Sequence, residues 1–372
     1  MTPELISIDV STGSQTESQS GLAMLRPRIW GSFITPPKAR TAAVVIHPTS
    51  NFMGHYLLAP LAERGIAALG LNTRYLGSDV TLLMERAIQD LGAGVKWLRA
   101  KGFQRILLIG NSGGGALVSL YQAQAERLTI TETPAGDPIR LDPADLPPAD
   151  AISLNAAHLG RMHLMNVWLA PAVIEETDAL GGDPKLDMFN LDNGPPYSVE
   201  FLAAYRAAQL ARNARIEVWA RAKLRQMRAM GDGASDMAFV IHRTLADPRC
   251  LDPAIDPNDR APGTTVWGPP RIQNMAANSI GRFTTLTAYL SQWSQSSRGD
   301  GPASLASTSV PVLLLEHTAD ASVFPSDNDR WATAAQGRVE RHRLARGNHY
   351  LAGQPHLVAE AADRISAFTE LL

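Results

Sequence analysis

The fold of this chain is decided by the stretch Arg105-Ile106-Leu107-Leu108-Ile109-Gly110-Asn111-Ser112-Gly113-Gly114-Gly115-Ala116-Leu117. A short apolar run ends abruptly in Gly-Asn-Ser-Gly-Gly, and an apolar, Ala-rich segment follows. The apolar run indicates a buried strand of the parallel type, and the segment after it indicates a helix. Ser112 therefore lies at the tip of a very tight strand–turn–helix connection. The pattern is G-x-S-x-G, the nucleophile elbow, in which a strained turn pushes a serine hydroxyl outward.

The glycines of this turn have a steric reason. Gly110 and Gly114 are expected where the strand and the departing helix come too close for side chains. The helix that begins near Gly113 directs free N–H groups and the positive end of its dipole toward Ser112. An oxygen that becomes negative during acyl transfer would be stabilised there. The alternative is a glycine-rich turn that only packs a helix on a sheet or cradles a phosphate.

Two downstream loops supply the partners that a nucleophilic serine needs, a histidine base and an acid that orients it. Asp320 follows a buried strand predicted over 310–317. His349 lies in a turn-rich loop between an alternating, edge-type strand over 339–344 and a final helix over 357–372. The chain order of the candidates is therefore Ser112, Asp320, His349.

Three other histidines compete for the role of base. His317 and His342 lie within strand patterns, which favours a place in the core or on the sheet surface. His47 ends a strand but precedes the nucleophile, so we expect it to brace the loop that follows it. His349 remains the preferred base because of its position after a strand end.

Other acidic residues compete with Asp320. Asp327 and Asp329 come just after Pro325 and Ser326, where a helix is predicted to begin, and acids in a first turn are favourable to the helix dipole. Glu316, at the end of the preceding strand, is the second choice of acid.

These residues together resemble the α/β-hydrolase superfamily, which uses the chain order nucleophile, acid, histidine. The resemblance covers roughly 40–130 and 305–372. It implies an α/β fold with a mostly parallel central sheet, helices on both faces and a mainly helical cap inserted in the sequence. It also implies that Ser112, Asp320 and His349 form a catalytic triad.

The resemblance extends to a loop that would help to stabilise an oxyanion. A buried strand over 41–46 is followed by His47-Pro48-Thr49-Ser50, where the superfamily often has His-Gly and a backbone N–H donor next. Pro48 has no N–H. The resemblance therefore implies Thr49 and Gly113 as the two backbone donors of the oxyanion hole.

The order of predicted elements divides the chain into two parts. Residues 1–155 and 301–372 are expected to form the core, and residues 156–300 the cap or lid. In the core we expect an entry hairpin of strands over 4–10 and 24–34, joined by a polar link at 11–21. Strands over 42–47, 66–72 and 151–155 and helices near 56–64 and 82–99 continue a parallel sheet.

The middle of the chain interrupts this alternation. Helices are predicted over 199–230, 234–246 and 271–293, and the Asp-Pro steps within 245–260 indicate turns rather than a calcium loop. The cap could line an apolar acyl pocket with Met, Trp, Phe and His side chains, or bury them in its own core. These residues are Met162, His163, Met165, Trp168, Trp219, Met237, Phe239, His242 and Trp267. Arginines that could hold a substrate carboxylate are Arg243, Arg249 and Arg260.

Composition narrows the classes of partner. The 34 basic and 36 acidic residues give a net charge of −2, which argues against nucleic-acid binding by bulk electrostatics. The single cysteine, Cys250, provides no disulfide framework and no Cys-rich metal site. No cofactor or metal is expected. The sequence shows neither a signal-peptide pattern nor a membrane-spanning run, so a cytoplasmic protein is expected, and a homodimer is left open.

The function expected from these residues is hydrolysis of a carboxylic ester of a small or medium-sized substrate through an acyl-enzyme. Thioester or amide hydrolysis would use the same triad. Hydrolysis of a carbon–carbon bond is a further alternative, because the Gly-Asn-Ser-x-Gly-Gly elbow is similar to that of such hydrolases. A non-catalytic ligand-binding protein of the same fold is the alternative from another class.

Overall fold

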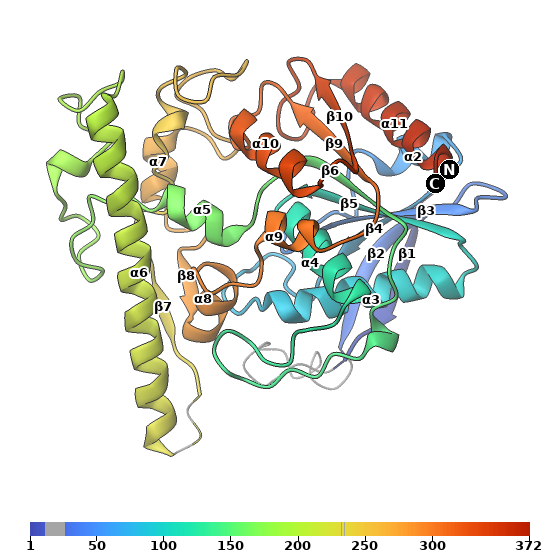
Figure 1. The fold of residues 1–372 in the computed structure, drawn as a ribbon, viewed down its shortest axis with the longest axis horizontal. Helices are drawn as coiled ribbons and strands as arrows, with labels where there is room; N and C mark the ends of the chain where they lie inside the picture. The colour runs from blue at the N-terminus through green and yellow to red at the C-terminus, as the bar shows by residue number, and fades with distance from the viewer. Residues whose placement is uncertain (12–26, 232, 234) are drawn as a thin grey trace.

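The computed structural model describes residues 1–11, 27–231, 233 and 235–372. Its centre is a twisted sheet of eight strands in the order β1-β2-β4-β3-β5-β6-β9-β10 (Figure 1). The strands are β1 (Glu4–Asp9), β2 (Arg28–Ile34), β3 (Thr41–His47), β4 (Ala67–Asn72), β5 (Arg105–Ser112), β6 (Ala151–Ala157), β9 (Val312–His317) and β10 (Val339–Leu344).

The sheet is mostly parallel, as predicted. β1 pairs with β2, and β2 with β4, in antiparallel register, and all the other neighbours in the sheet are parallel. The predicted entry hairpin is thus present, with Glu4 opposite Phe33. Its predicted polar link lies, apart from residue 11, outside the described residues. β10 forms an edge of the sheet, as its alternating pattern indicated.

Helices cover both faces of the sheet because alternate residues of its buried strands point to opposite sides. In β3, Ala42 and Val44 face one hydrophobic core, and Ala43 and Val45 face the other. The first core is closed by α3 (Met84–Ala100), α4 (Gly114–Glu126), α9 (Gly301–Ala306) and α10 (Pro325–Ala334). The second is closed by α2 (Leu58–Glu63) and α11 (Pro355–Glu370).

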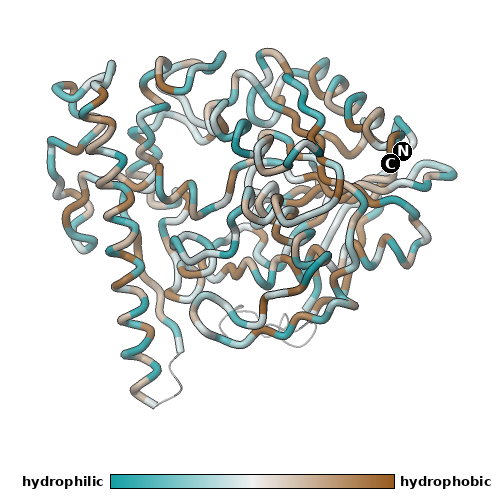
Figure 2. The backbone as a smooth tube through the Cα atoms, in the orientation of Figure 1, coloured by the Kyte–Doolittle hydropathy of each residue, from teal (hydrophilic) through white to brown (hydrophobic). Residues whose placement is uncertain are grey.

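A second group of elements lies beside the sheet, on the left of Figure 1. It contains α5 (Arg161–Trp168), α6 (Val199–Met230), α7 (Pro270–Met275), α8 (Leu286–Gln292) and the short pair β7 (Ala238–Val240) and β8 (Phe283–Thr285). These elements pack around separate hydrophobic clusters of their own. In Figure 2, α6 alternates between hydrophilic and hydrophobic stretches along its length, as expected for a helix with one packed and one solvent-facing side.

Two helix predictions in this region are wrong. Within 234–246 the described residues contain β7, which pairs with β8 in antiparallel register. The predicted helix at 271–293 is divided by the same pairing, since α7 ends at Met275 and β8 precedes α8. Strand pairing between segments more than 40 residues apart has overridden the local helical pattern. The predicted helix at 199–230 is confirmed.

The Asp247-Pro248 step, within the run 245–260 where turns were predicted, forms a turn, and two Asp-Pro steps outside that run do the same. Three 3₁₀ helices begin at such steps: η1 (Pro143–Asp145), η2 (Pro184–Leu186) and η3 (Pro248–Cys250). In each, the preceding aspartate accepts a hydrogen bond from the backbone N–H two residues later.

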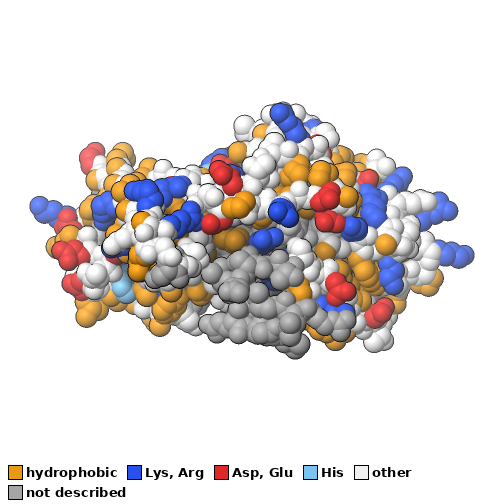
Figure 3. Space-filling view, turned by 90° about the horizontal axis from the view of Figure 1, so that it is seen from below, with side chains coloured by type: hydrophobic (Ala, Val, Ile, Leu, Met, Phe, Trp, Pro, Cys, Tyr) orange, Lys and Arg blue, Asp and Glu red, His pale blue; other side chains and the backbone are white. Residues whose placement is uncertain are grey.

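The surface carries both signs of charge. On the face seen in Figure 3, basic and acidic side chains are interspersed, which agrees with the near balance of 34 and 36 charged residues. None of the helices within the described ranges combines the length and the apolar character that crossing a bilayer requires.

Candidate active site

Ser112 occupies a strained turn at the carboxyl end of β5. Its φ is +56°, in the left-handed region that side chains other than glycine rarely adopt, and the residue is buried. The turn depends on glycines. A Cβ on Gly110 would lie 2.7 Å from the Cα of Gly115, and one on Gly114 would lie 2.1 Å from the carbonyl oxygen of Ile46. The departing helix thus excludes a side chain at 110, and strand β3 excludes one at 114.

Asp320 and His349 form a buried pair. Nδ1 of His349 lies 2.7 Å from Oδ2 of Asp320, and Oδ1 of Asp320 accepts the backbone N–H groups of Ser322 and Val323 at 2.8 and 3.1 Å. Burial alone would raise the pKa of Asp320, but His349 and these hydrogen bonds hold it below its ordinary value. The ionised carboxylate keeps a proton on Nδ1 of His349, which leaves Nε2 free to accept another.

Two neighbours connect this pair to Ser112. The backbone N–H of His158 donates to the carbonyl oxygen of Ser112 at 2.9 Å, and the His158 ring lies 5.5 Å from the His349 ring. The Tyr350 ring lies 4.5 Å from the His349 ring. Burial raises the pKa of the Tyr350 hydroxyl, and the nearby side chains of Ser112 and Ser50 act in the opposite direction. All of these residues follow strand ends at one edge of the sheet.

The Tyr350 hydroxyl is therefore a close neighbour of Ser112. Among the described residues, no direct hydrogen bond joins Ser112 Oγ to His349 Nε2. Catalytic hydrogen bonds often tighten only when substrate is bound, so the arrangement is compatible with later transfer of the Ser112 proton to His349.

The competing acids are engaged elsewhere. Glu316 binds Arg341 at 2.7 Å, and Asp329 binds the same arginine at 2.7 Å. Asp327 accepts the backbone N–H of Phe324 at 3.0 Å and so caps α10, as its place in a first helical turn predicted.

The competing histidines also have other partners. His317 is buried, and its Nδ1 lies 2.8 Å from the carbonyl oxygen of Asn348. His342 pairs with Glu340 on the edge strand. The placement of both agrees with the core and sheet-surface roles expected from their strand patterns.

His47 braces the loop after β3, as predicted, and in doing so changes the interpretation of Thr49. Nδ1 of His47 accepts the N–H groups of Thr49 at 3.1 Å and of Ser50 at 2.8 Å. The expected oxyanion donor at Thr49 therefore has an acceptor within its own loop, and its role stays a prediction. Burial, aided by Arg161, holds the pKa of His47 well below its usual range, so the ring is neutral.

Gly113, the other expected donor, lies at the start of α4. A Cβ there would lie 2.8 Å from Nε2 of His47, so only glycine fits this contact. Because Nδ1 of the neutral His47 ring accepts two hydrogen bonds, its proton lies on Nε2, beside Gly113. The N-terminus of α4 and this imidazole N–H together make the space near Ser112 favourable to a negative oxygen.

Comparisons with known proteins support the architecture. No protein-family model and no curated protein sequence matches the chain. Among solved structures, the α/β hydrolase GrgF from Penicillium sp. sh18 has a TM-score of 0.50 at 11% identity, with 98% of each chain covered. DcsB, solved with its substrate analogue, has a TM-score of 0.50 at 13% identity, again with 98% of each chain covered. The chain has the α/β-hydrolase fold.

A protein named for an activity is also similar to this chain. An esterase from Pyrococcus furiosus is 12% identical, covers 99% of this chain and 90% of its own, and has a TM-score of 0.48. At such identities the likeness concerns the fold, and the activity must be argued from the site.

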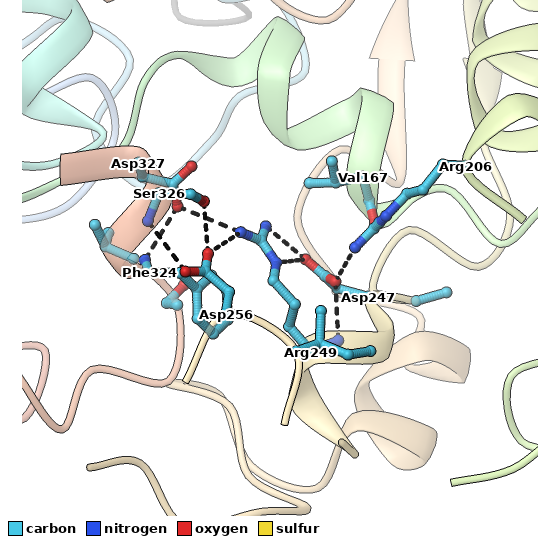
Figure 4. A network of polar contacts seen from close by, with 12 residues as sticks. Val167, Arg206, Asp247, Arg249, Asp256, Phe324, Ser326 and Asp327 are labelled. Atoms are coloured by element: carbon cyan, nitrogen blue, oxygen red, sulfur yellow. Dashed lines mark hydrogen bonds and ion pairs between the residues drawn. The ribbon is translucent and has the colours of Figure 1, made fainter. Parts of the chain in front are cut away.

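The three arginines considered for a substrate carboxylate have internal partners, so that expectation is not supported. Arg243 donates to the carbonyl oxygens of Ala179 and Leu180. Arg260 donates to four backbone carbonyl oxygens. Arg249 is bound by acidic side chains (Figure 4).

The Arg249 network links the helical region beside the sheet to the loop that carries Asp320. Arg249 donates to the buried Asp247 at 2.8 and 3.0 Å and reaches Asp256 at 3.4 Å and Asp327 at 3.7 Å (Figure 4). Its guanidinium also lies 4.0 Å from the centre of the Phe324 ring. Asp327 and Phe324 lie at the start of α10, a few residues after Asp320, so the network fixes the position of the acid loop.

The Met, Trp, Phe and His side chains of the cap divide between its interior and its surface. Met165 and Trp168 are buried in the cap's own cluster, with Met237 and Phe239 packed against it. Trp219 and Trp267 are 39% and 41% exposed. Trp267 contacts Trp168 edge to face, with centroids 5.3 Å apart, and Trp168 contacts His158 in the same way at 5.8 Å.

A cavity of about 440 Å³ lies between the loop after β3 and the cap. Its lining residues are Thr49, Gly77, Ser78, Asp79, Trp267, Gln273, Asn278, Ser279 and Ile280. Within the described ranges, no group of three or more His, Cys, Asp or Glu side chains is placed to hold a metal ion.

Sequence reasoning missed several residues of this site. His158, Tyr350 and Arg161 have no motif of their own, and their roles depend on loops that meet only in the fold. His55 is a further case, since its Nε2 lies 2.9 Å from Oδ1 of Asn111, next to the nucleophile. The position of Tyr350 directly after His349 was the one available signal.

Proposed function

We propose that this α/β-hydrolase is a serine hydrolase that cleaves a carboxylic ester through an acyl-enzyme. One observation carries the proposal: a serine held at φ +56° lies at the same sheet edge as a buried His–Asp pair with a 2.7 Å contact. A strained non-glycine residue at a strand end has a cost of about 1–3 kcal/mol, which a purely structural turn does not require.

The residues support a two-step reaction. Ser112 Oγ attacks the ester carbonyl while His349 Nε2 takes its proton, and the ionised Asp320 stabilises the imidazolium. His349 then gives the proton to the departing alcohol, leaving Ser112 acylated. Water attacks the acyl group with His349 as base, which releases the acid and restores the serine hydroxyl.

The oxyanion needs at least two donors, and the contacts favour the Tyr350 hydroxyl over the Thr49 N–H as partner of the Gly113 N–H. The Tyr350 hydroxyl lies near Ser112, whose Oγ becomes bonded to the oxyanion carbon. The Thr49 N–H would first have to leave His47. A hydroxyl donor aimed at the developing charge is the kind of group that stabilises such a transition state.

Covalent labelling tests the proposal directly. The wild type is incubated with a fluorophosphonate probe, its intact mass is measured, and a panel of p-nitrophenyl esters is assayed. We expect one adduct and ester turnover in the wild type, and neither in Ser112→Ala. The control is Ser119→Ala, which removes a buried hydroxyl bonded to its own helix and should behave like the wild type.

Each result has a defined meaning. An unlabelled wild type that turns over no ester would overturn the proposal and favour a ligand-binding protein of this fold. Labelling without ester turnover would show an activated serine and contradict the ester as substrate. Thioesters, amides and substrates with a cleavable carbon–carbon bond would then be assayed.

A further inference from the structure

We propose that the 440 Å³ cavity beside Thr49 binds a neutral, polyhydroxylated portion of the substrate, such as a glycerol or sugar moiety. The inference rests on the proposed ester hydrolase and names its substrate class. Four features of the cavity support it: its position, the polar groups of its walls, their balanced charge and one partly exposed aromatic ring.

The cavity borders the loop after β3, which lies beside the candidate nucleophile. Thr49 forms part of its wall. The side chain of the next residue, Ser50, lies near the Tyr350 hydroxyl, and so does Ser112. The backbone N–H of Gly77 donates to the carbonyl oxygen of Thr49 at 2.8 Å, which ties the second wall loop to the first. When the ester carbonyl of a substrate is bound at Ser112, one of the two ends of the substrate can therefore extend into the cavity.

The walls offer hydrogen-bonding groups of both kinds. Ser78 and Ser279 carry hydroxyls, and Gln273 and Asn278 carry side-chain amides. Within the described residues, neither of these two amides has a hydrogen-bond partner in the protein. Hydroxyl and amide groups both donate and accept, which matches the dual character of sugar or polyol hydroxyls.

The one acidic side chain in the wall is already neutralised. Asp79 pairs with the buried Arg161 at 3.0 Å and accepts the backbone N–H of Gly281 at 3.2 Å. Arg161 in turn donates to Gln292 and to Thr49 Oγ1 at 2.7 and 3.1 Å. Among the described wall residues, no uncompensated charge therefore remains for a carboxylate or an ammonium group, and a neutral ligand is favoured.

Trp267 supplies an aromatic surface. Its ring is 41% exposed, and its contact with the buried Trp168 holds it in place. A fixed aromatic ring beside several dual-character polar groups suits a ligand that has C–H faces and hydroxyl edges. Trp168 also contacts His158, which places this surface on the same side as the candidate triad.

The test compares esters that differ only in their hydroxyls. On the alcohol side the pair is glyceryl monobutyrate and propyl butyrate, and on the acyl side it is methyl gluconate and methyl hexanoate. We expect kcat/KM to favour the hydroxylated member of one pair by about tenfold, the effect of one or two hydrogen bonds. The pair that shows the preference identifies which end of the substrate occupies the cavity.

Variants connect the preference to the cavity. Trp267→Ala and the double variant Gln273→Ala/Asn278→Ala should reduce the preference to about twofold or less, because the hydroxylated ester loses more of its kcat/KM than the apolar ester does. Trp219→Ala is the matched control, because this cap tryptophan is equally exposed but lines a different cavity. Equal rates for both members of both pairs, or a preference that survives in both variants, would overturn the inference.

A binding measurement makes the inference testable without turnover. Saturation-transfer NMR on Ser112→Ala compares methyl glucoside with cyclohexanol, and we expect transfer to the glucoside that disappears when Trp267→Ala is added. No transfer to the glucoside would count against the cavity as a hydroxyl-binding site. Fluorophosphonate labelling of the wild type without any hydroxyl preference would contradict this inference alone, whereas absent labelling would contradict the proposed hydrolase.

Discussion

The central sheet and the helical region over 161–292 are stabilised in different ways. Strands such as β4 and β6 are buried at every position, and two apolar cores cover the two faces of the sheet. In the helical region, buried polar groups hold irregular loops. Arg212, for instance, is completely buried and donates to Glu176 and to the carbonyl oxygens of Ala170 and His242. Apolar burial leaves a periodic pattern in a sequence, whereas such hydrogen bonds join positions with no fixed spacing.

The largest expected contrast concerns glycines in the two regions. Gly114→Ala places a Cβ 2.1 Å from the carbonyl oxygen of Ile46, and because backbone meets backbone there, the contact has little room to relax. We expect the free energy of unfolding to fall by more than about 3 kcal/mol. Gly231→Ala, at the end of α6 with φ +71° and no atom within 4 Å, should cost about 1 kcal/mol. Urea unfolding of both variants measures this, and equal losses would contradict the contrast.

Removal of Arg249 tests the claim that buried ionic contacts hold the cap to the core. Arg249→Met leaves Asp247 buried with only Arg206 as its charged partner, so we expect a loss of about 3–5 kcal/mol. Arg364→Met, which breaks an exposed pair with Glu360 on α11, should cost less than about 0.5 kcal/mol. Thermal and urea unfolding compare the two, and an Arg249→Met variant as stable as Arg364→Met would show that the network contributes little.

Tyr350→Phe tests whether the core supplies a side-chain donor to the oxyanion. If the hydroxyl acts in the transition state, kcat should fall by about 10- to 100-fold with KM little changed, and the rate of fluorophosphonate labelling should fall in parallel. Tyr56→Phe is the matched control, since its buried hydroxyl has no hydrogen-bond partner among the described residues. A Tyr350→Phe enzyme with wild-type kcat would contradict a role of this hydroxyl in the oxyanion hole. The second donor would then be assigned to the loop after β3.

The pH dependence of stability should be governed by neutral histidines of the core. Burial, as the largest cause, lowers the pKa of His158 to about 3 and of His55 and His317 to about 4. The unfolded chain binds protons at these sites below about pH 6.5, while the folded chain does not, so stability is complete above that pH and falls as the pH is lowered toward 4.

Urea unfolding at pH 6.5, 5.5 and 4.5 checks this smallest effect. In the wild type, the free energy of unfolding should decrease as the pH is lowered. His158→Gln should make this decrease smaller by up to about 1.4 kcal/mol per pH unit, because one proton fewer is taken up on unfolding. The exposed His356→Gln is the control and should keep the wild-type slope. An unchanged slope in His158→Gln would contradict a neutral His158 in the folded state.

The sequence predicts secondary structure correctly where the pattern of apolar residues within one short segment is sufficient. The strands over 42–47 and 151–155 and the helix over 199–230 were expected from apolar runs and helical spacing, and the structure contains them. The helix expected over 234–246 fails because Phe239 pairs with Thr284 across 45 positions, which no local window can register. The same limit applies to the site, where Tyr350 and His158 become visible only when loops from separate strands meet.

By itself, the sequence determined the strand–turn–helix connection at Ser112 and the order of Ser112, Asp320 and His349 after strand ends. Both depend on residue types at adjacent positions, and parallel strands bring their carboxyl ends to one edge. Only the tertiary structure decided where the Thr49 N–H points, which groups hold Arg249, and how Trp267 and Asp79 come to face one cavity. These outcomes depend on the packing of the cap against the core, because a hydrogen bond selects its partner by distance and direction rather than by position in the chain.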